Sequence, residues 1–424
     1  MITVVKADGS AEQKQIEAMR QRAAETNAGI SKSAAEIMEA VRQRGYEAVR
    51  EYSLQFDKAE PYEISGETLE AAAKRIDPEL LAALKQSAAN IRAYQQELLS
   101  KSRVWESPMA GGMVGQLVRG LTRVGVYVPG GRAAYPSSVL MNVIPAKVAG
   151  CEEIIMVTPP TENLNDAVLA AAFVAEVDRV IAVGGVQAVA ALTYGAGFIP
   201  KVDKLVGPGN AYVAAAKRMA YGTLDIDMVA GPSEVLVIAD ETANPVYTAA
   251  DLLSQAEHDV MASAVLLTTS EKLAERVVAE IKRQTDYLSR KDVMLQSLRD
   301  YGAIIVCDTL DQCCDLANEI APEHLEVMTR DPQALLPKLK NAGAIFLGEN
   351  TPEPLGDYMA GPCHVLPTSG TARFFSPLSV ESFLKKTSVI DFSRSALESV
   401  KDGIIRMAES EHLTAHANSI KVRF

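Results

Sequence analysis

Gln255 and His258 stand three residues apart in LLSQAEHDVMAS, a segment whose pattern predicts a helix. Residues three apart on a helix share one face, one turn from each other. Imidazole nitrogen is a common zinc ligand, and an amide oxygen is a rarer one that is chemically allowed. The pair is therefore either helix packing or part of a metal site.

The histidines of the chain are concentrated in its second half, near other groups that can do chemistry. The five are His258, His324, His364, His412 and His416. In EHLTAH the last two have the i, i+4 spacing of paired zinc-ligating histidines, but no general-base Glu lies between them. Asp357 lies in EPLGDYMAGP, where a Gly- and Pro-rich loop can direct a carboxylate at a cation. The spacing indicates a site without choosing its ligands.

Two further pairs offer proton or nucleophile chemistry. Glu323 and His324 in APEHLEV would supply two bases of different strength, or they are a solvent-facing loop pair at the start of a strand. Cys363 beside His364 would be a thiol nucleophile, but a small buried cysteine is the favoured interpretation.

Three glycine loops follow predicted strands. In LVGPGNAYVAAAKR, Gly207 and Gly209 fill the first two positions of GxGxxG, and Tyr212 replaces the third glycine. Such a loop lets phosphate approach the backbone and a helix N-terminus, although without the third glycine a plain turn between strand and helix is the favoured interpretation. VYVPGG and VGGVQA are the other two loops. The side chains beside these loops that could touch a ligand are Tyr127, Gln187 and Asn210.

The elements that must position these residues alternate between short apolar runs and helices. Runs such as VGVYV, EEIIMV, EVLVIA and SAVLLT alternate with helical stretches, which predicts βαβ units and mainly parallel sheets. The number of runs favours two α/β domains over one open sheet. The uncharged residues 180–200 are interpreted as strand, glycine turn and buried helix rather than as a membrane span.

The composition excludes some classes of partner. The chain has 424 residues, 48% of them hydrophobic, and a net charge of -12, which argues against a nucleic-acid or anionic-membrane surface. Five cysteines without a CxxC motif, and an N-terminus with no apolar signal region, predict a reducing, cytoplasmic location.

Taken together, these motifs resemble the histidinol dehydrogenase family over nearly the whole chain. The resemblance rests on GVYVPGG, GPGNAYVAAAKR, DMVAGPSEVLVIAD, LLSQAEHD, APEHLE, LTAHANSIKVR and the long segment from NAGAIFLGEN to VESFLKK. It implies oxidation of L-histidinol to L-histidine through an aldehyde, with NAD as the hydride acceptor and zinc as the bound metal. It also implies that zinc mainly positions the substrate.

The resemblance assigns roles to residues of this chain. It implies zinc ligation by Gln255, His258, Asp357 and His416, and acid and base roles for Glu323 and His324. Substrate contacts would be made by Ser233, His324, Glu411 and the four zinc ligands, and NAD contacts by Tyr127, Gln187 and Asn210.

The resemblance further implies an α/β fold of two incomplete Rossmann-like domains with parallel sheets, plus small N- and C-terminal helical extensions. Residues 1–23 would form the N-terminal helical arm, and residues 24–126 with 233–378 the main domain that carries the zinc and catalytic residues. Residues 127–232 would form the NAD-binding domain. Residues 379–424 would form an arm exchanged between the subunits of a homodimer.

Two positions depart from the family pattern. His412 stands where the family usually has Gly, at a position expected to be helical, which a histidine tolerates better than glycine does. Cys363 stands where Asn is common. Two alternatives to the family activity remain open: a paralogue that oxidises another polar amino alcohol or polyol, and a zinc hydrolase that uses Glu323 without nicotinamide.

Overall fold

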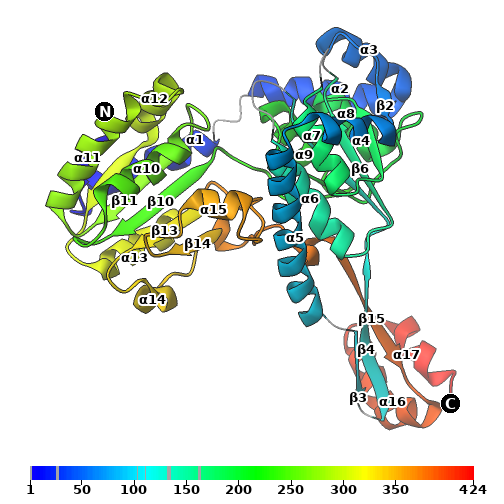
Figure 1. Ribbon diagram of the computed structural model, residues 1–424. Coiled ribbons are helices and arrows are strands. Elements are labelled where there is room, and N and C mark those ends of the chain that lie inside the picture. The colour runs from blue at the N-terminus through cyan, green and yellow to red at the C-terminus, as the bar shows by residue number, and fades with distance from the viewer. Residues whose placement is uncertain (1, 25–27, 103, 110, 131–134, 161–163) are drawn as a thin grey trace.

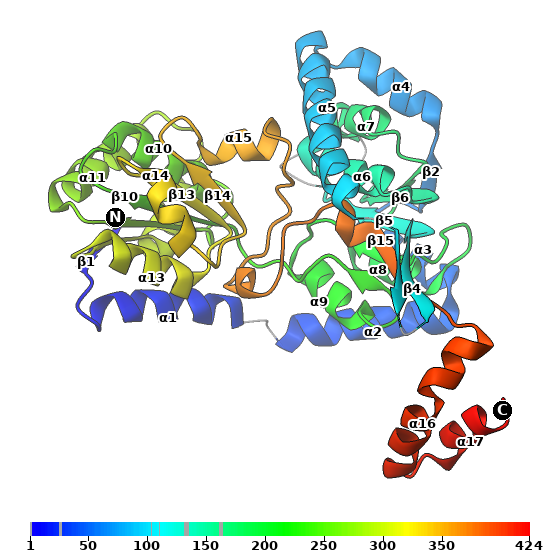
Figure 2. The same ribbon diagram turned by 90° about the horizontal axis from the view of Figure 1, so that it is seen from below.

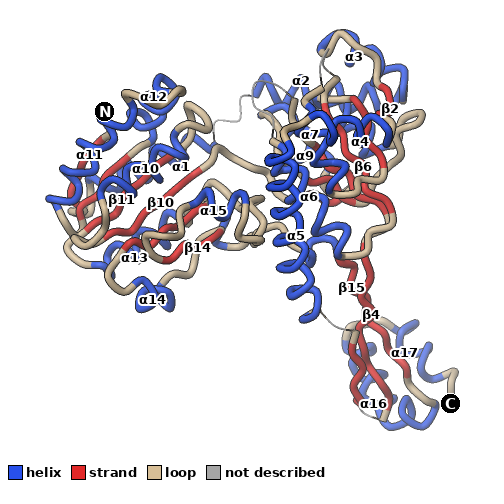
Figure 3. Tube along the Cα trace, in the orientation of Figure 1, coloured by secondary structure: helices blue, strands red, loops and turns tan. Residues whose placement is uncertain are grey.

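A computed structural model describes residues 2–24, 28–102, 104–109, 111–130, 135–160 and 164–424 (Figure 1). Two bodies with parallel sheets lie side by side, and a smaller body projects from one of them. Figure 3 shows that helices surround the strands of both larger bodies. The expected α/β fold with two parallel-sheet domains is confirmed.

Sheet A is fully parallel, with strand order β1-β12-β11-β10-β13-β14. Its strands are β1 Thr3–Lys6, β10 Glu234–Ala239, β11 Ser263–Thr268, β12 Ala303–Val306, β13 His324–Met328 and β14 Ala344–Leu347. Every residue of β10, β11 and β13 is buried, as expected for strands covered on both faces. The accompanying helices are α1 Ala11–Ala24, α10 Pro245–Ala256, α11 Glu271–Thr285, α12 Lys291–Tyr301, α13 Leu310–Ile320 and α14 Pro332–Leu335, followed by the 3-10 turn η1 Leu336–Lys338.

Sheet B has the order β2-β7-β6-β5-β8-β9, and only β2 runs antiparallel to its neighbour. Its strands are β2 Tyr62–Ile64, β5 Arg123–Tyr127, β6 Glu153–Thr158, β7 Arg179–Ala182, β8 Lys204–Val206 and β9 Asp225–Ile226. The chain builds β6 and β7 on one side of β5 and then β8 and β9 on the other. This reversal is the switch point at which dinucleotide-binding sheets place their ligand.

The helices around sheet B come from both the first hundred residues and the βαβ crossovers. They are α2 Ala28–Arg44, α3 Tyr46–Phe56, α4 Gly66–Arg75, α5 Pro78–Lys101, α6 Pro136–Val148, α7 Asp166–Val174, α8 Gly185–Tyr194 and α9 Ala211–Ala220. Residues 180–200 run from β7 through α8, as expected. No helix among the described ranges is long and apolar enough to cross a bilayer.

The projecting body is a three-stranded antiparallel sheet with two helices, at the lower right of Figure 1. It consists of β3 Trp105–Met109, β4 Gly112–Gly120, β15 Leu384–Asp391, α16 Arg394–Ser410 and α17 Thr414–Lys421. We call it the arm. Between β14 and the arm lie α15 Glu353–Tyr358 and the 3-10 turns η2 Thr371–Arg373 and η3 Val380–Phe383.

The division of the N-terminal segments differs from the expected one. Residues 28–101 were assigned to the domain of the catalytic residues, but α2 packs on α8 and α9, and α5 packs on α6, around sheet B. Strand β1 pairs with β12 instead of belonging to a separate helical arm. The amphipathic pattern of these helices shows that they bury one face but not which sheet they cover. Figure 2 shows α1 beneath sheet A and α2 beneath sheet B.

The short connection 227–233 decides how the two sheets meet. It leaves the carboxyl end of β9 and enters the amino end of β10. A chain segment of this length spans at most about 25 Å, at 3.3–3.6 Å per residue. The carboxyl edge of sheet B must therefore lie close to the amino edge of sheet A.

Candidate active site

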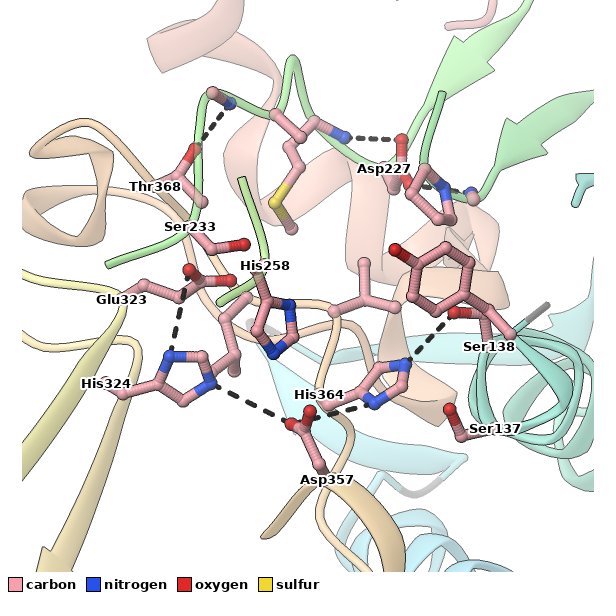
Figure 4. Close-up of a pocket in the computed structure, with 18 of the residues that line it drawn as sticks. Ser137, Ser138, Asp227, Ser233, His258, Glu323, His324, Asp357, His364 and Thr368 are labelled. Carbon is pink, nitrogen blue, oxygen red and sulfur yellow. Dashed lines mark hydrogen bonds and ion pairs between the residues drawn. The ribbon is translucent and has the colours of Figure 1, made fainter. Parts of the chain in front are cut away.

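A cavity of about 370 Å³ lies between these two edges. Sheet A and the loops around it contribute Ser233, Gln255, His258, Glu323, His324, Glu353, Asp357 and His364 to its lining. Sheet B and its loops contribute Pro129, Ser137, Ser138, Gly207, Pro208, Gly209 and Asp227. In Figure 4 the side chains of His258, His324, Asp357 and His364 converge on one space.

Glu323 and His324 are placed by the start of β13 and by its neighbour β10. The backbone N–H of Glu234 donates to Glu323 Oε2 at 2.9 Å, and the Glu234 carbonyl accepts from His324 Nδ1 at 2.9 Å. Both side chains are more than nine-tenths buried. The interpretation of this pair as a solvent-facing loop is therefore excluded.

The contact with Glu234 also sets the tautomer of His324. A carbonyl only accepts, so Nδ1 carries the proton and Nε2 presents its lone pair to the cavity. His324 Nε2 lies 3.8 Å from Glu353 Oε1 and 3.9 Å from Asp357 Oδ1, and no described residue forms a hydrogen bond with it. The imidazole is held by one nitrogen and free at the other.

Gln255 lies in the last turn of α10, whereas His258 lies in the turn directly after the helix, so the expected helix does not reach His258. This helix begins at Pro245, and the Asn244 side chain caps it by accepting from the N–H of Val246. Gln255 is 1% exposed, yet within the described parts of the chain neither its amide oxygen nor its amide nitrogen has a hydrogen-bond partner. An unpaired buried amide is costly, so this side chain is built for a group that joins it in the cavity.

The donor set fits a divalent cation. Gln255, His258 and Asp357 all line the cavity, and they offer amide oxygen, imidazole nitrogen and carboxylate oxygen. His324, Glu353 and Asp357 place one ligand atom each within 4.8 Å of one another. Glu353 was not anticipated from the sequence, because its place depends on the non-local bond from its own N–H to Glu326 Oε1 at 2.8 Å.

His364 is the second side chain that the sequence interpretation missed. Its Nδ1 lies 3.7 Å from Asp357 Oδ1, and its Nε2 lies 3.4 Å from Ser138 Oγ on the opposite wall. The segment GPCHV contains this histidine, but the sequence interpretation considered it only as the neighbour of the Cys363 thiol. Cys363 instead faces away and donates to the Met141 carbonyl at 3.3 Å. Burial raises the pKa of the Cys363 thiol to about 12, so it is no nucleophile.

Burial dominates the electrostatics of the cavity. It lowers the pKa of His324 to about 4, although the Asp357 carboxylate opposes the shift, so the imidazole is neutral at pH 7. Burial raises the pKa of Glu323 well above its ordinary value, and it raises the pKa of Glu353 to about 9, with Asp357 adding to the effect. The imidazole is therefore unprotonated and able to accept a proton, while burial favours the protonated form of the two carboxyls and makes their carboxylates stronger bases once ionised.

A buried ion pair holds the loop after β8. Lys217 pairs with Asp227, and the side chains of both are less than 5% exposed. Asp227 Oδ2 accepts from the N–H of Gly207 at 2.8 Å, and Lys217 Nζ donates to the carbonyl of Gly207 at 2.8 Å. Gly207 has a φ of 107°, and a Cβ there would lie 2.1 Å from the Tyr127 carbonyl oxygen. The glycine is therefore required, and its loop is fixed against the cavity.

The expected NAD contacts lie on sheet B, next to the cavity rather than in its lining. The Tyr127 hydroxyl accepts from the N–H of Gly185 at 3.0 Å, and Gln187 Nε2 donates to Asp57 Oδ2 at 3.2 Å. Asn210 caps α9. Gly131 of the VYVPGG loop lies outside the described residues.

Glu411 and His416 are not in the cavity. Both are exposed on the arm, far from sheet A in Figure 1. The expectation of a helical position for His412 is wrong. Helix α16 ends at Ser410, and His412 has a φ of 59°, the left-handed conformation that glycine adopts most easily after a helix.

A sheet with dinucleotide-binding strand order faces a cavity with a buried neutral imidazole, buried carboxyl groups and donors for a cation. This arrangement defines an α/β oxidoreductase. The sequence matches the family model described as histidinol dehydrogenase over residues 20–424. The chain belongs to the histidinol dehydrogenase family.

Relatives and solved structures agree. The chain is 55% identical to a histidinol dehydrogenase from Heliobacterium mobile over 94% of both chains, and 51% identical to one from Clostridium acetobutylicum over 98% of both. The crystal structure of histidinol dehydrogenase from Elizabethkingia anophelis superposes with a TM-score of 0.94 at 36% identity, covering 100% of this chain and 98% of that one.

Proposed function

We propose that the protein oxidises L-histidinol to L-histidine through the aldehyde, with NAD as the oxidant, in the last two steps of histidine biosynthesis. The observation that carries this proposal beyond family membership is the free Nε2 of His324, aimed into the cavity beside Asp357 and Glu353. NAD+, when bound, supplies the hydride acceptor for each of the two oxidations.

His324 takes the hydroxyl proton in the first oxidation. A primary alcohol can lose hydride only if its O–H proton leaves as well, and neutral Nε2 is the base within the cavity. The bond from Nδ1 to Glu234 keeps the ring oriented while Nε2 gains the proton and stabilises the imidazolium that forms.

Glu323 acts in the second oxidation. The aldehyde must be hydrated before another hydride can leave, and a carboxylate accepts the proton of the attacking water. Burial raises the pKa of Glu323, which makes its carboxylate a stronger base than an exposed one. Its bond from the Glu234 N–H fixes one carboxylate oxygen and leaves the other for water.

Gln255, His258 and Asp357, with His416 from the arm, are the residues that would hold zinc. When bound, zinc anchors the amine and imidazole nitrogens of the substrate and so positions its alcohol carbon. Ser233 and Glu411 would add substrate contacts. Tyr127, Gln187 and Asn210 would contact NAD.

A homodimer with exchanged arms would complete the site. His416 and Glu411 are exposed in the single chain, and seven of the eight residues of β15 are exposed as well. Large apolar side chains stand open on the arm, namely Trp105, Met109, Leu117, Ile390, Met407, Val422 and others. Such a surface is typical of an interface. Five free, buried cysteines agree with a cytoplasmic location.

The test is NADH absorbance after mixing zinc-loaded protein with limiting L-histidinol and excess NAD+. We expect about two NADH per histidinol, lost on chelation and restored by zinc. One NADH per substrate would mean an enzyme that stops at the aldehyde. No NADH would favour a paralogue acting on another amino alcohol, or a hydrolase if metal-dependent hydrolysis is found instead.

A further inference from the structure

Asp57 stands at the C-terminal end of α3, directly beside an expected NAD contact. Its Oδ2 accepts from Gln187 Nε2 at 3.2 Å, the only hydrogen bond recorded for its side chain in the described parts of the chain. Asp57 is partly exposed, and its neighbour Phe56 is 53% exposed. The second carboxylate oxygen therefore remains available to a ligand at an open surface.

The strand order of sheet B tells which half of a dinucleotide would reach Asp57. The part of sheet B that contains β8 and β9 lies next to the cavity, because the loops after these strands contribute Gly207, Pro208 and Asp227 to its lining. The reacting nicotinamide must lie there, because the base and the substrate donors line the same cavity. The other half, the adenosine, then extends over β6 and β7, on the opposite side of β5.

Gln187 and Asp57 lie at that adenosine side. Gln187 stands in the first turn of α8, which follows β7, and α3 packs against α8. Its Oε1 is buried and lacks a partner, while its Nε2 is held by Asp57. Gln187 is 1% exposed and holds the carboxylate in place, whereas the partly exposed Asp57 presents an acceptor oxygen, which suits the donor hydroxyls of a ribose.

Among the residues that the structure describes, no cation pairs with this carboxylate, and the adjacent Lys58 ammonium donates to the Gln55 carbonyl at 2.7 Å. The groups that set the pKa of Asp57 are its burial, which raises the value, and the Gln187 amide, which lowers it, with no lysine or arginine among them. An acidic group at the adenosine ribose accepts from the 2′-hydroxyl and repels a 2′-phosphate, whereas enzymes that prefer the phosphorylated cofactor place an arginine there.

We propose that Asp57 binds the adenosine ribose of NAD and selects NAD over NADP. The inference deepens the proposed function, since it requires a nicotinamide dinucleotide on sheet B. In this role Asp57 contributes to recognition of the dinucleotide, and it lies away from the groups that take protons from the substrate.

The test is direct binding of NADH and NADPH, which differ only in the 2′-phosphate, measured by calorimetry on the zinc-loaded dimer. Asp57→Asn keeps an oxygen for the Gln187 amide but removes the charge, so the fold is retained. We expect NADH to bind about tenfold more weakly, in line with the loss of a charged hydrogen bond. NADPH should bind more tightly than it binds the unmodified protein. In kinetics, the KM for NAD+ should rise while kcat changes little.

Glu60→Gln is the matched control, because it neutralises an exposed acid three residues away that pairs with Arg50. It should leave both affinities unchanged. Glu162→Gln is the competing variant, since Glu162 follows β6 in the sequence, where such folds often carry the ribose-binding acid. Glu162 itself lies outside the residues that the structure describes.

An unchanged ratio of NADPH to NADH affinity in Asp57→Asn overturns the inference, and so does a shift of that ratio in Glu162→Gln alone. Neither result touches the proposed function, because the unmodified protein would still bind NADH and reduce NAD+. If the unmodified protein binds neither nucleotide, the proposed function and the inference both fail.

Discussion

At the scale of single residues, the proposed acid and base residues and the proposed metal ligands reach the cavity from different elements. Glu323 and His324 are neighbours in the chain, and both are fixed by the backbone of Glu234. His258 belongs to a different part of the fold, the turn directly after α10, whose last turn holds Gln255. Replacing the base should therefore change kcat, whereas replacing the metal ligand should change the amount of bound zinc.

We expect His258→Asn to lose bound zinc and His324→Asn to keep it. His324→Asn should lower kcat by about 10²- to 10⁴-fold, the usual contribution of a general base. The measurements are metal content after gel filtration and kcat at saturating zinc. Glu271→Gln, an exposed acid paired with Lys6, is the control and should change neither value. Stoichiometric zinc in His258→Asn would refute the proposed coordination.

The sequence singled out many, but not all, of the chemically active side chains that line the cavity. Gln255, His258, Glu323, His324 and Asp357 were singled out, and all five line one space. Glu353 and His364 could not be ranked, because their roles depend on contacts with distant residues. Glu353 reaches the cavity through Glu326, and His364 through Ser138. Local sequence patterns do not show which distant residues these two side chains contact.

At the scale of elements, strand and helix types follow from local pattern, whereas their partners do not. The apolar runs EVLVIA and SAVLLT predicted strands, and the structure has them as the fully buried β10 and β11. The assignment of residues 28–101 failed because an amphipathic helix covers either sheet equally well. The helical expectation at 412 failed because the end of α16 was placed too late.

His412→Gly should stabilise the end of α16. A non-glycine residue in the left-handed conformation is strained, so the variant should raise the free energy of unfolding by up to about 1 kcal/mol. Denaturant unfolding measures the change. His412→Ala keeps the Cβ and its strain, so it should show no gain. A fall in stability for His412→Gly would mean that the imidazole makes a stabilising contact.

At the scale of the whole molecule, the cavity lacks the two expected site residues that lie on the arm, and a partner subunit can supply them. The arm holds two of the expected site residues and exposes apolar side chains, while the cavity lies between the two sheets. If arms are exchanged, each site combines the cavity of one subunit with the arm of its partner. Defects in cavity and arm then belong to different sites in a mixed dimer.

Mixing His324→Asn subunits with His416→Asn subunits should therefore restore activity. Half of the randomly formed dimers are mixed, and each has one intact site of two, so about a quarter of full activity is expected. The measurement is NADH production after joint refolding or coexpression. His324→Asn mixed with His258→Asn is the control, since both defects lie in the cavity and no intact site can form. Absence of recovery in the first mixture would contradict exchange of the arm.

The pairing of β1 with β12 has a consequence for how the protein is made. All strands of sheet B have been synthesised once residue 226 has left the ribosome, so that body can form early. Thr3 pairs with Ala303, so the first strand emerges at the start of translation and must wait until β12, residues 303–306, has been made. During that interval it is an unpaired strand edge open to wrong partners. Its place at the border of sheet A lets the rest of the sheet assemble without it, and the earliest segment of the chain docks among the last.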